Sequence, residues 1–250
     1  MNKWVKGLIS ILLVSVLSLQ VFQPVSAAVD LKKAKTLSFN KNLTGKLTTG
    51  NGNYEHVYKA KLKKNGNLSI TVQTNTKRSW YVEVLTSKGE KMTSFYTTTK
   101  SKGNEVREIG LSKGTYYVAI SGIYDTAYKM KVNFKSSNYY EREDNDTVKK
   151  ANVIKFSKNY SGALQEFTDQ DYFKFTVTKK RKVSLTYNNT PKKQRDLLIV
   201  NAKGKEYAKI RTDYYVKKPT KSTHTVTLPK GTYYVLVQYG GGSYTFKLAQ

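Results

Sequence analysis

Carboxylates are scarce in this sequence, yet four of them lie together in residues 141–146, EREDND. The chain holds 44 Lys and Arg residues against 17 Asp and Glu residues, and seven of those acids fall between Glu141 and Asp171. Like charges so close together repel one another, so the cluster must be solvated, paired with basic side chains or neutralised by a bound cation. It is therefore a candidate cation site.

Calcium is the cation that these oxygen donors suit best. It takes about six to eight oxygen ligands, mainly from carboxylates, amides, carbonyls and water. Glu141, Glu143 and Asn145 share one parity, so an extended chain would point all three the same way. Asp169 and Asp171 add two carboxylates at the start of a predicted strand. We predict a calcium site from these residues.

Two other interpretations of the acidic residues remain open. They could form a solvated linker that Lys149 and Lys150 neutralise, or a catalytic pair of carboxylates. The chain has two histidines, His56 and His224, no cysteine and no G-x-S-x-G, H-E-x-x-H or phosphate-loop motif. A catalytic triad assembled in space would leave no such motif. We rank a non-catalytic role first.

The N-terminus has the pattern of a secretory signal peptide, residues 1–28. Lys3 and Lys6 precede the apolar run LISILLVSVL, and VSAAV offers small residues for cleavage after Ala27 or Ala28. No later apolar run has the length of a membrane span. Without cysteine the chain forms no disulfide. We therefore predict a protein secreted to the extracellular space.

The net charge favours anionic partners. The formal charge is +27, and removal of Lys3 and Lys6 with the signal peptide leaves +25. Such a charge suits teichoic acid, acidic polysaccharide, nucleic acid, acidic protein or a membrane surface, although it also keeps a secreted protein soluble.

The mature sequence contains two copies of one unit. LSKGTYYVAI, residues 111–120, recurs as LPKGTYYVLV, residues 228–237. LTGKL, residues 43–47, recurs at the same offset as YSGAL, residues 160–164. Collinear matches of this kind indicate a tandem duplication, for which we predict domains at 29–137 and 138–250.

Apolar residues alternate with polar ones within each copy. In DYFKFTV, residues 171–177, the apolar Phe173, Phe175 and Val177 alternate with Lys174 and Thr176, and every second residue of YKMKVNF, residues 128–134, is apolar, as in half-buried strands. Turn sequences such as KKNGN and AKGKE separate these short runs. We predict an all-β protein of two tandem antiparallel jelly-roll β-sandwich domains, with about eight strands in each.

Two groups of residues are candidates for ligand contact. Tyr234 and Leu236 share the strand face opposite the predicted core, where a tyrosine could stack on a ligand or pack under a loop. RTDYYVKKPTK, residues 211–221, combines aromatic and basic side chains in a predicted loop or edge strand. Its candidate residues are Tyr214, Tyr215, Lys217 and Lys218.

The second copy resembles the bacterial pre-peptidase C-terminal domain and its near relative, the collagen-binding domain of bacterial collagenases. The resemblance depends on the order of E-x-E-x-N-D-T from residue 141, DQDYFKF from residue 169 and LPKGTYYVLV from residue 228. It covers Glu141 to Leu248 well and Leu43 to Phe134 more weakly.

That resemblance implies a jelly-roll sandwich that serves as a binding or secretion-associated module beside a protease. It also implies that the acidic lead-in and the loop before the DYF strand hold calcium. The implied ligands are Glu141, Glu143, Asn145, Asp146, Asp169 and Asp171. The first copy has VDLKKAKTL and NGNYEHV at the corresponding places, so we expect no such site there.

These observations favour a secreted, non-catalytic protein that binds an extracellular partner through basic, tyrosine-rich surface. The resemblance suggests a collagen-like protein as the partner, and the charge suggests an anionic cell-wall polymer. Nucleic acid is a rival, because basic aromatic grooves bind single strands, although export makes it an unusual target. A further alternative is an accessory or inhibitory partner of a secreted protease.

Overall fold

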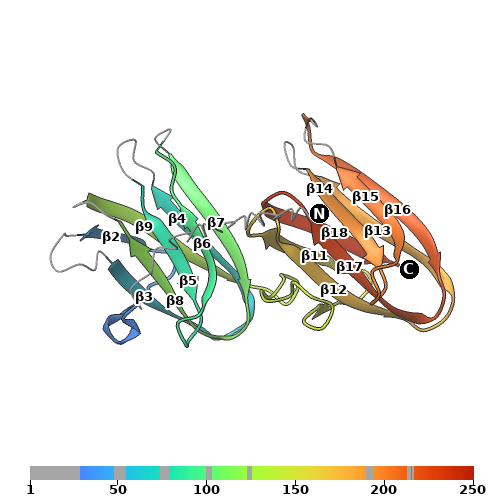
Figure 1. Ribbon diagram of the computed structural model, residues 1–250, viewed down its shortest axis with the longest axis horizontal. Coiled ribbons are helices and arrows are strands. Elements are labelled where there is room, and N and C mark those ends of the chain that lie inside the picture. Colours follow the sequence, from blue (N-terminus) through green and yellow to red (C-terminus); the bar gives the residue numbers. More distant parts are fainter. Residues whose placement is uncertain are drawn as a thin grey trace, which may run out of the picture.

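The protein consists of two β-sandwiches that lie side by side along its long axis, joined by the segment 137–151 (Figure 1). The computed structural model describes residues 29–47, 55–73, 79–99, 103–122, 126–189, 194–212, 215 and 217–250. The predicted signal peptide, residues 1–28, lies outside the described residues. None of the described helical segments is long and apolar enough to cross a membrane.

The first sandwich begins with the short 3-10 helix η1 (Leu31–Lys33) and has two sheets. One has the order β1 (Lys35–Thr36), β3 (Glu55–Leu62), β8 (Gly114–Ser121), β5 (Tyr81–Leu85) and β6 (Lys91–Tyr96). The other has the order β2 (Asn42–Leu47), β9 (Thr126–Ser136), β4 (Gly66–Gln73) and β7 (Asn104–Leu111).

The second sandwich also has two sheets. One has the order β10 (Asn152–Val153), β12 (Gln170–Val177), β17 (Gly231–Gln238), β14 (Arg195–Val200) and β15 (Glu206–Thr212). The other has the order β11 (Asn159–Leu164), β18 (Gly242–Ala249), β13 (Arg181–Asn189) and β16 (Thr220–Leu228). This is the strand order of the first sandwich with every label raised by nine, so each strand has a counterpart in the other sandwich.

The all-β class with two sandwiches is confirmed, but the pairing is not antiparallel throughout. The two-residue strands β1 and β10 pair in parallel with β3 and β12. In each case the intervening strand, β2 or β11, lies in the opposite sheet. Because the chain crosses between sheets before it returns, the first and third strands run the same way. With one of these short strands in each sandwich, the described residues form nine strands per sandwich, one more than the predicted eight or so.

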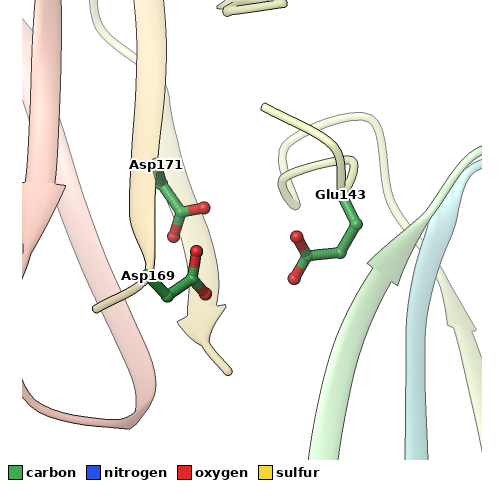
Figure 2. Close-up of side chains that lie close together, drawn as sticks. All are labelled: Glu143, Asp169 and Asp171. Carbon is green, nitrogen blue, oxygen red and sulfur yellow. The ribbon is translucent and has the colours of Figure 1, made fainter. Parts of the chain in front are cut away.

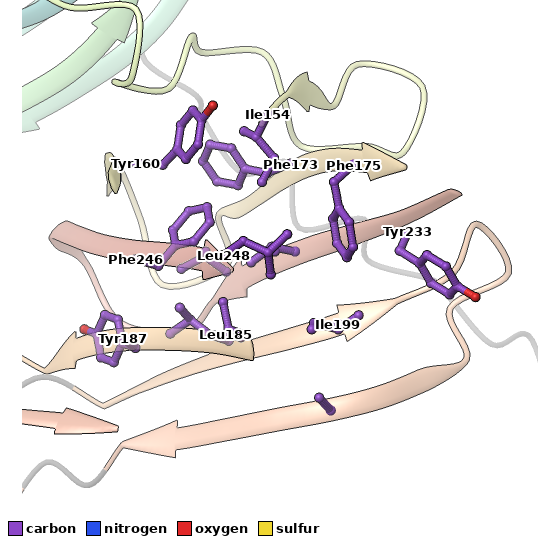
Figure 3. Packing of buried hydrophobic residues seen from close by; sticks show 14 of the residues in the cluster. Ile154, Tyr160, Phe173, Phe175, Leu185, Tyr187, Ile199, Tyr233, Phe246 and Leu248 are labelled. Carbon is purple, nitrogen blue, oxygen red and sulfur yellow. The ribbon is translucent and has the colours of Figure 1, made fainter. Parts of the chain in front are cut away.

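The predicted alternation fills the interior of each sandwich. In the second, Phe173, Phe175 and Val177 of β12 point inward and pack with Phe246 and Leu248 of β18 (Figure 3). The first sandwich has a corresponding core, which includes Tyr58, Val118 and Met130. Since successive side chains of a strand face opposite sides, the same alternation determines which residues reach the outer faces.

Candidate metal centre

Three carboxylates from two separate segments converge beside the junction of the sandwiches. Glu143 lies on the segment that joins the sandwiches, Asp169 on the loop after β11, and Asp171 at the start of β12. One carboxylate oxygen of each lies within 4.8 Å of those of the other two. Figure 2 shows Glu143 pointing across toward the two aspartates. Three of the six predicted ligands are therefore brought together.

Burial makes this group of carboxylates hard to ionise. Asp171 has no exposed surface, and burial raises its pKa to about 7. Burial, followed by the charges of Asp171 and Asp169, raises the pKa of Glu143 well above its usual value. Burial also raises the pKa of Asp169. Among the described residues no basic side chain forms an ion pair with these three carboxylates, so a proton or a cation is favoured there.

Glu141 belongs to a buried network beside these three carboxylates. Its Oε1 accepts a 2.6 Å hydrogen bond from the backbone N–H of Ala163, and its Oε2 lies 2.6 Å from the hydroxyl of Tyr244. The same hydroxyl lies 2.6 Å from Oδ2 of Asp171. A hydroxyl carries one proton, so it can donate to only one of the two carboxylates. The other contact requires a second proton or a cation.

Asn145 and Asp146 take different positions around the site. Asn145 is fully buried, and in the amide orientation that its surrounding acceptors require, its nitrogen donates to Oδ1 of Asp171 at 3.2 Å. Its backbone oxygen accepts a hydrogen bond from Tyr172 at 3.0 Å. Asp146 is exposed and lines the adjoining cleft rather than the carboxylate group.

The prediction that an extended chain points Glu141, Glu143 and Asn145 the same way is wrong. Asp144 has a φ of 75°, which interrupts the alternation between Glu143 and Asn145. Left-handed backbone of this kind is tolerated best by glycine, asparagine and aspartate among the residues. Glu143 points to the aspartates (Figure 2), whereas Glu141 points to Tyr244.

A cleft of about 490 Å³ adjoins the site. Its lining comes from both sandwiches: Thr86 and residues 90–94 on one side, and acidic residues that include Glu143, Asp146 and Asp169 on the other. A hydrated cation could reach Glu143 and Asp169 from this cleft. The amino-acid sequence does not indicate that residues of the first sandwich would line the site.

Gln165, which the sequence analysis did not select, connects the site to the first sandwich. Its Nε2 lies 2.9 Å from Oε1 of Glu143 and 2.9 Å from the backbone oxygen of Glu108 in β7. Its Oε1 accepts a 3.1 Å hydrogen bond from Thr93, and its backbone oxygen accepts one of 2.7 Å from Arg107. No motif could have identified it, because its partners come from three other segments.

Tyr244 is the other residue that sequence analysis missed, and the internal repeat could have identified it. It pairs in register with Gly162 of β11, as Tyr128 pairs with Gly45 of β2. A Cβ atom on Gly162 would lie 2.2 Å from both the Tyr244 hydroxyl and Oε2 of Glu141. Glycine is therefore required for this contact.

The first sandwich has a histidine in place of the buried aspartate. His56 faces Ile120 in the register of β3 and β8, as Asp171 faces Val237 in β12 and β17. Its Nδ1 lies 2.8 Å from the hydroxyl of Tyr128, and burial lowers its pKa. A neutral imidazole thus stands where the second sandwich has a carboxylate, and the predicted lack of a metal site in the first copy stays a prediction.

The donor set is chemically suited to calcium. All of the candidate side-chain ligands offer oxygen, and three separate carboxylates supply most of the charge. The two aspartates lie at a strand end and the glutamate on a turn, so the donors are held before a cation arrives. Glu143, Asp169 and Asp171 would hold the ion, with Asn145 and Glu141 beside them.

The predicted ligand-binding residues fall into a buried group and an exposed group. Tyr234 and Leu236 are only 6% and 8% exposed, because Val148 and Ala151 of the connecting segment cover them. Their assignment to a ligand surface is therefore wrong: they form a small core outside the sheet. Apolar side chains on that face are buried when the segment packs on it.

The second group of predicted ligand-binding residues lies at the surface. Tyr215 is 83% exposed, and Lys217 and Lys218 are exposed as well. Tyr214 lies outside the described residues.

Comparisons with known proteins give matches among solved structures only. No known protein family matches the sequence, and no curated protein matches it. The pre-peptidase C-terminal domain of collagenase from Bacillus anthracis is similar over 41% of this chain and 94% of that chain, with 15% identity and a TM-score of 0.32.

Two other matching structures span more of the chain. The PBSX exported protein XepA is similar over 83% of this chain and 86% of that chain, with 9% identity and a TM-score of 0.24. A tandem of two CBM22 domains from Paenibacillus barcinonensis Xyn10C is similar over 83% of this chain and 85% of that chain, with 9% identity and a TM-score of 0.27.

Proposed function

We propose that this protein is a secreted, non-catalytic binding protein that holds an extracellular polymer or protein, with its second sandwich stabilised by calcium. The observation that carries the metal assignment is the approach of Glu143, Asp169 and Asp171 to within 4.8 Å of one another. Asp171 is buried and the other two are partly buried, and carboxylates in such surroundings repel one another unless a proton or a cation intervenes. At extracellular calcium concentrations the cation is the natural partner for such a site.

Calcium in this position has a structural role. Asp171 is buried at the start of β12, and Glu143 lies on the segment that leads into the second sandwich. An ion that binds both would fix the connecting segment on the sheet edge. Because the ion binds only the folded state, it stabilises the fold by mass action.

The binding role is inferred from surface charge and exposed aromatic residues. The chain carries a formal charge of +27, and Tyr215, Lys217 and Lys218 form an exposed group at one edge. Tyrosine supplies flat contact area and lysine supplies charge. A collagen-like protein and an anionic cell-wall polymer are the two partners for which this surface is suited.

Co-sedimentation tests the binding role. The mature chain would be mixed with insoluble collagen and, separately, with isolated walls of a Gram-positive bacterium, at about 0.05 M and 0.3 M salt. We expect retention on at least one of them. Retention on walls that falls steeply with salt indicates an anionic polymer, whereas retention on collagen should change little. If the protein stays in the supernatant in every case, the binding role is wrong.

A further inference from the structure

Strand β9 carries a row of lysines on the outer face of the first sandwich. Tyr128, Met130 and Val132 point into the core. The alternate residues therefore face outward, and they include Lys129, Lys131 and Lys135, which we call the lysine row. Lys129 and Lys135 are exposed and Lys131 is partly exposed. Neighbours on one face of a strand are about 7 Å apart, so the row spans roughly 20 Å.

Neutral hydrogen-bonding side chains flank the lysine row on both sides. Lys131 pairs in register with Asn42 of β2 and Thr71 of β4, and Lys129 pairs with Thr44. Two hollows open on this face, with volumes of about 590 and 350 Å³, and Lys129 lines both. Lys131 lines the smaller hollow as well, so positive charge and neutral polar side chains lie together at this part of the face.

The lysine row has no carboxylate partner among the described residues. Across the described residues, the carboxylates that form ion pairs are those of Asp30, Asp144 and Asp196. None of them pairs with a lysine of the row. A row of like charges without counter-charges attracts anions from solution.

The fold does not require a lysine at every position of the row. β18 is the counterpart of β9, since Tyr244 occupies the position of Tyr128. In this alignment Thr245 of β18 takes the place of Lys129 and Lys247 takes the place of Lys131, while Lys135 lies past the last residue of β18. The counterpart strand therefore folds with a neutral residue at one position of the row, and the complete row of three lysines occurs in β9 but not in β18.

We infer that the lysine row is a binding site for a linear polymer of polyol phosphate, of the teichoic acid type. This inference rests on the proposed binding function and names the surface and the ligand. Lysine binds phosphate as a point charge, and hydroxyl and amide side chains such as Thr44, Thr71 and Asn42 bind phosphate oxygens and hydroxyl groups. A polymer with one phosphate per short repeat can place successive charges along the strand.

The same face is less suited to single-stranded nucleic acid. Such binding normally relies on bases that stack on exposed aromatic side chains. The aromatic residues that line the hollows, Trp80 and Tyr128, are both only 3% exposed. Charge with hydroxyl groups, rather than charge with aromatic rings, is what the face offers.

Titration with a synthetic poly(glycerol phosphate) oligomer tests this site. The triple variant Lys129→Gln, Lys131→Gln, Lys135→Gln removes the row. The matched control Lys182→Gln, Lys221→Gln, Lys247→Gln removes equal charge from the outer face of the second sandwich, where all three lysines are exposed. We expect the row variant to bind about tenfold or more weaker, and its slope of log affinity against log salt to fall by about 2, at roughly 0.7 for each lost phosphate contact. The control should lose less than about threefold.

Equal losses in the two variants would overturn the inference, because net charge rather than the row would then govern binding. Tighter binding of poly(dT) than of poly(glycerol phosphate), lost in the same row variant, would overturn it in favour of nucleic acid. A wild-type protein that binds collagen but not poly(glycerol phosphate) would also overturn it and leave the proposed function standing. A protein that binds neither would remove both. Unchanged melting curves for the two triple variants establish that they are folded.

Discussion

The hydroxyl oxygen of Tyr244 lies 2.6 Å from Oδ2 of Asp171 in the interior of the second sandwich. The same oxygen lies 2.6 Å from Oε2 of Glu141, so two buried carboxyl groups contact a hydroxyl that has one proton to donate. Burial and the charge of Asp171 raise the pKa of Glu141 well above its usual value. The free energy of unfolding of this sandwich should therefore depend on whether a proton or a cation neutralises these carboxyl groups.

Replacing Tyr244 with phenylalanine should destabilise the second sandwich. The change removes the hydroxyl that both Glu141 and Asp171 contact and leaves their oxygens short of a donor, at a cost of about 1–3 kcal/mol. Urea denaturation in the presence of chelator measures the change. The matched variant is Tyr128→Phe, whose hydroxyl contacts His56 and Tyr58 rather than carboxylates. An equal or larger loss in Tyr128→Phe would show that the carboxylates are not the cause.

Stability should fall as the pH rises when calcium is removed. Asp171 has a folded pKa of about 7 and an unfolded pKa of about 4. Between these values the folded state holds a proton that the unfolded state has lost, so the free energy of unfolding decreases from pH 4 to pH 7, by on the order of 4 kcal/mol at most. Calcium should remove this loss, because it replaces the proton. Thermal melts at pH 5 and pH 8, each with calcium and with chelator, test the expectation. A calcium-induced shift as large at pH 5 as at pH 8 would contradict it.

The substitution Asp171→Asn should have opposite effects with and without calcium. It removes one buried negative charge while keeping the shape, so in chelator at pH 8 the variant should be more stable than the wild type by about 1–3 kcal/mol. With calcium the order should reverse, because the variant has lost a ligand. Asp144→Asn is the control, since that carboxylate is exposed and paired with Lys150. A variant that still gains stability from calcium would exclude Asp171 as a ligand.

Replacing Gly162 with alanine should disrupt the network by crowding. Its Cβ atom would lie 2.2 Å from Oε2 of Glu141 and from the Tyr244 hydroxyl, so at least one of them must move. We expect a loss of about 1–3 kcal/mol, together with weaker calcium binding in a calorimetric titration. Gly241→Ala is the control, because the nearest atom to its Cβ is the Leu164 oxygen at 3.8 Å. If both variants bind calcium like the wild type, Glu141 has no part in positioning the site.

Removing the side chain of Gln165 should loosen the junction between the sandwiches. Gln165→Ala deletes hydrogen bonds to Glu108, Thr93 and Glu143 while leaving the strands intact. We expect a larger radius of gyration in small-angle X-ray scattering and faster proteolysis within 137–151. The control Gln170→Ala removes a glutamine whose partner, Gln238, lies in the same sandwich. Identical scattering from wild type and Gln165→Ala would mean that other contacts determine the arrangement.

Much of the fold could be predicted from the sequence because strand periodicity is local. The alternation in residues 171–177 correctly placed Phe173, Phe175 and Val177 in the core. The repeated GTYY segments correctly indicated equivalent strands, β8 and β17. Neither pattern could identify the parallel pairs β1–β3 and β10–β12, because two residues are too few for a periodicity.

For the candidate site, residue types alone identified the carboxylates and the chemistry that they favour. Composition marked Glu143, Asp169 and Asp171 because acids are rare in so basic a chain. Only the tertiary structure decided their geometry, because a left-handed turn at Asp144 breaks the alternation between Glu143 and Asn145 and because Gln165 finds its partners across two sandwiches. It also decided that Tyr234 is covered, since the segment that buries it is distant in sequence. Side-chain chemistry is a property of single residues, whereas convergence and burial depend on contacts between distant parts of the chain.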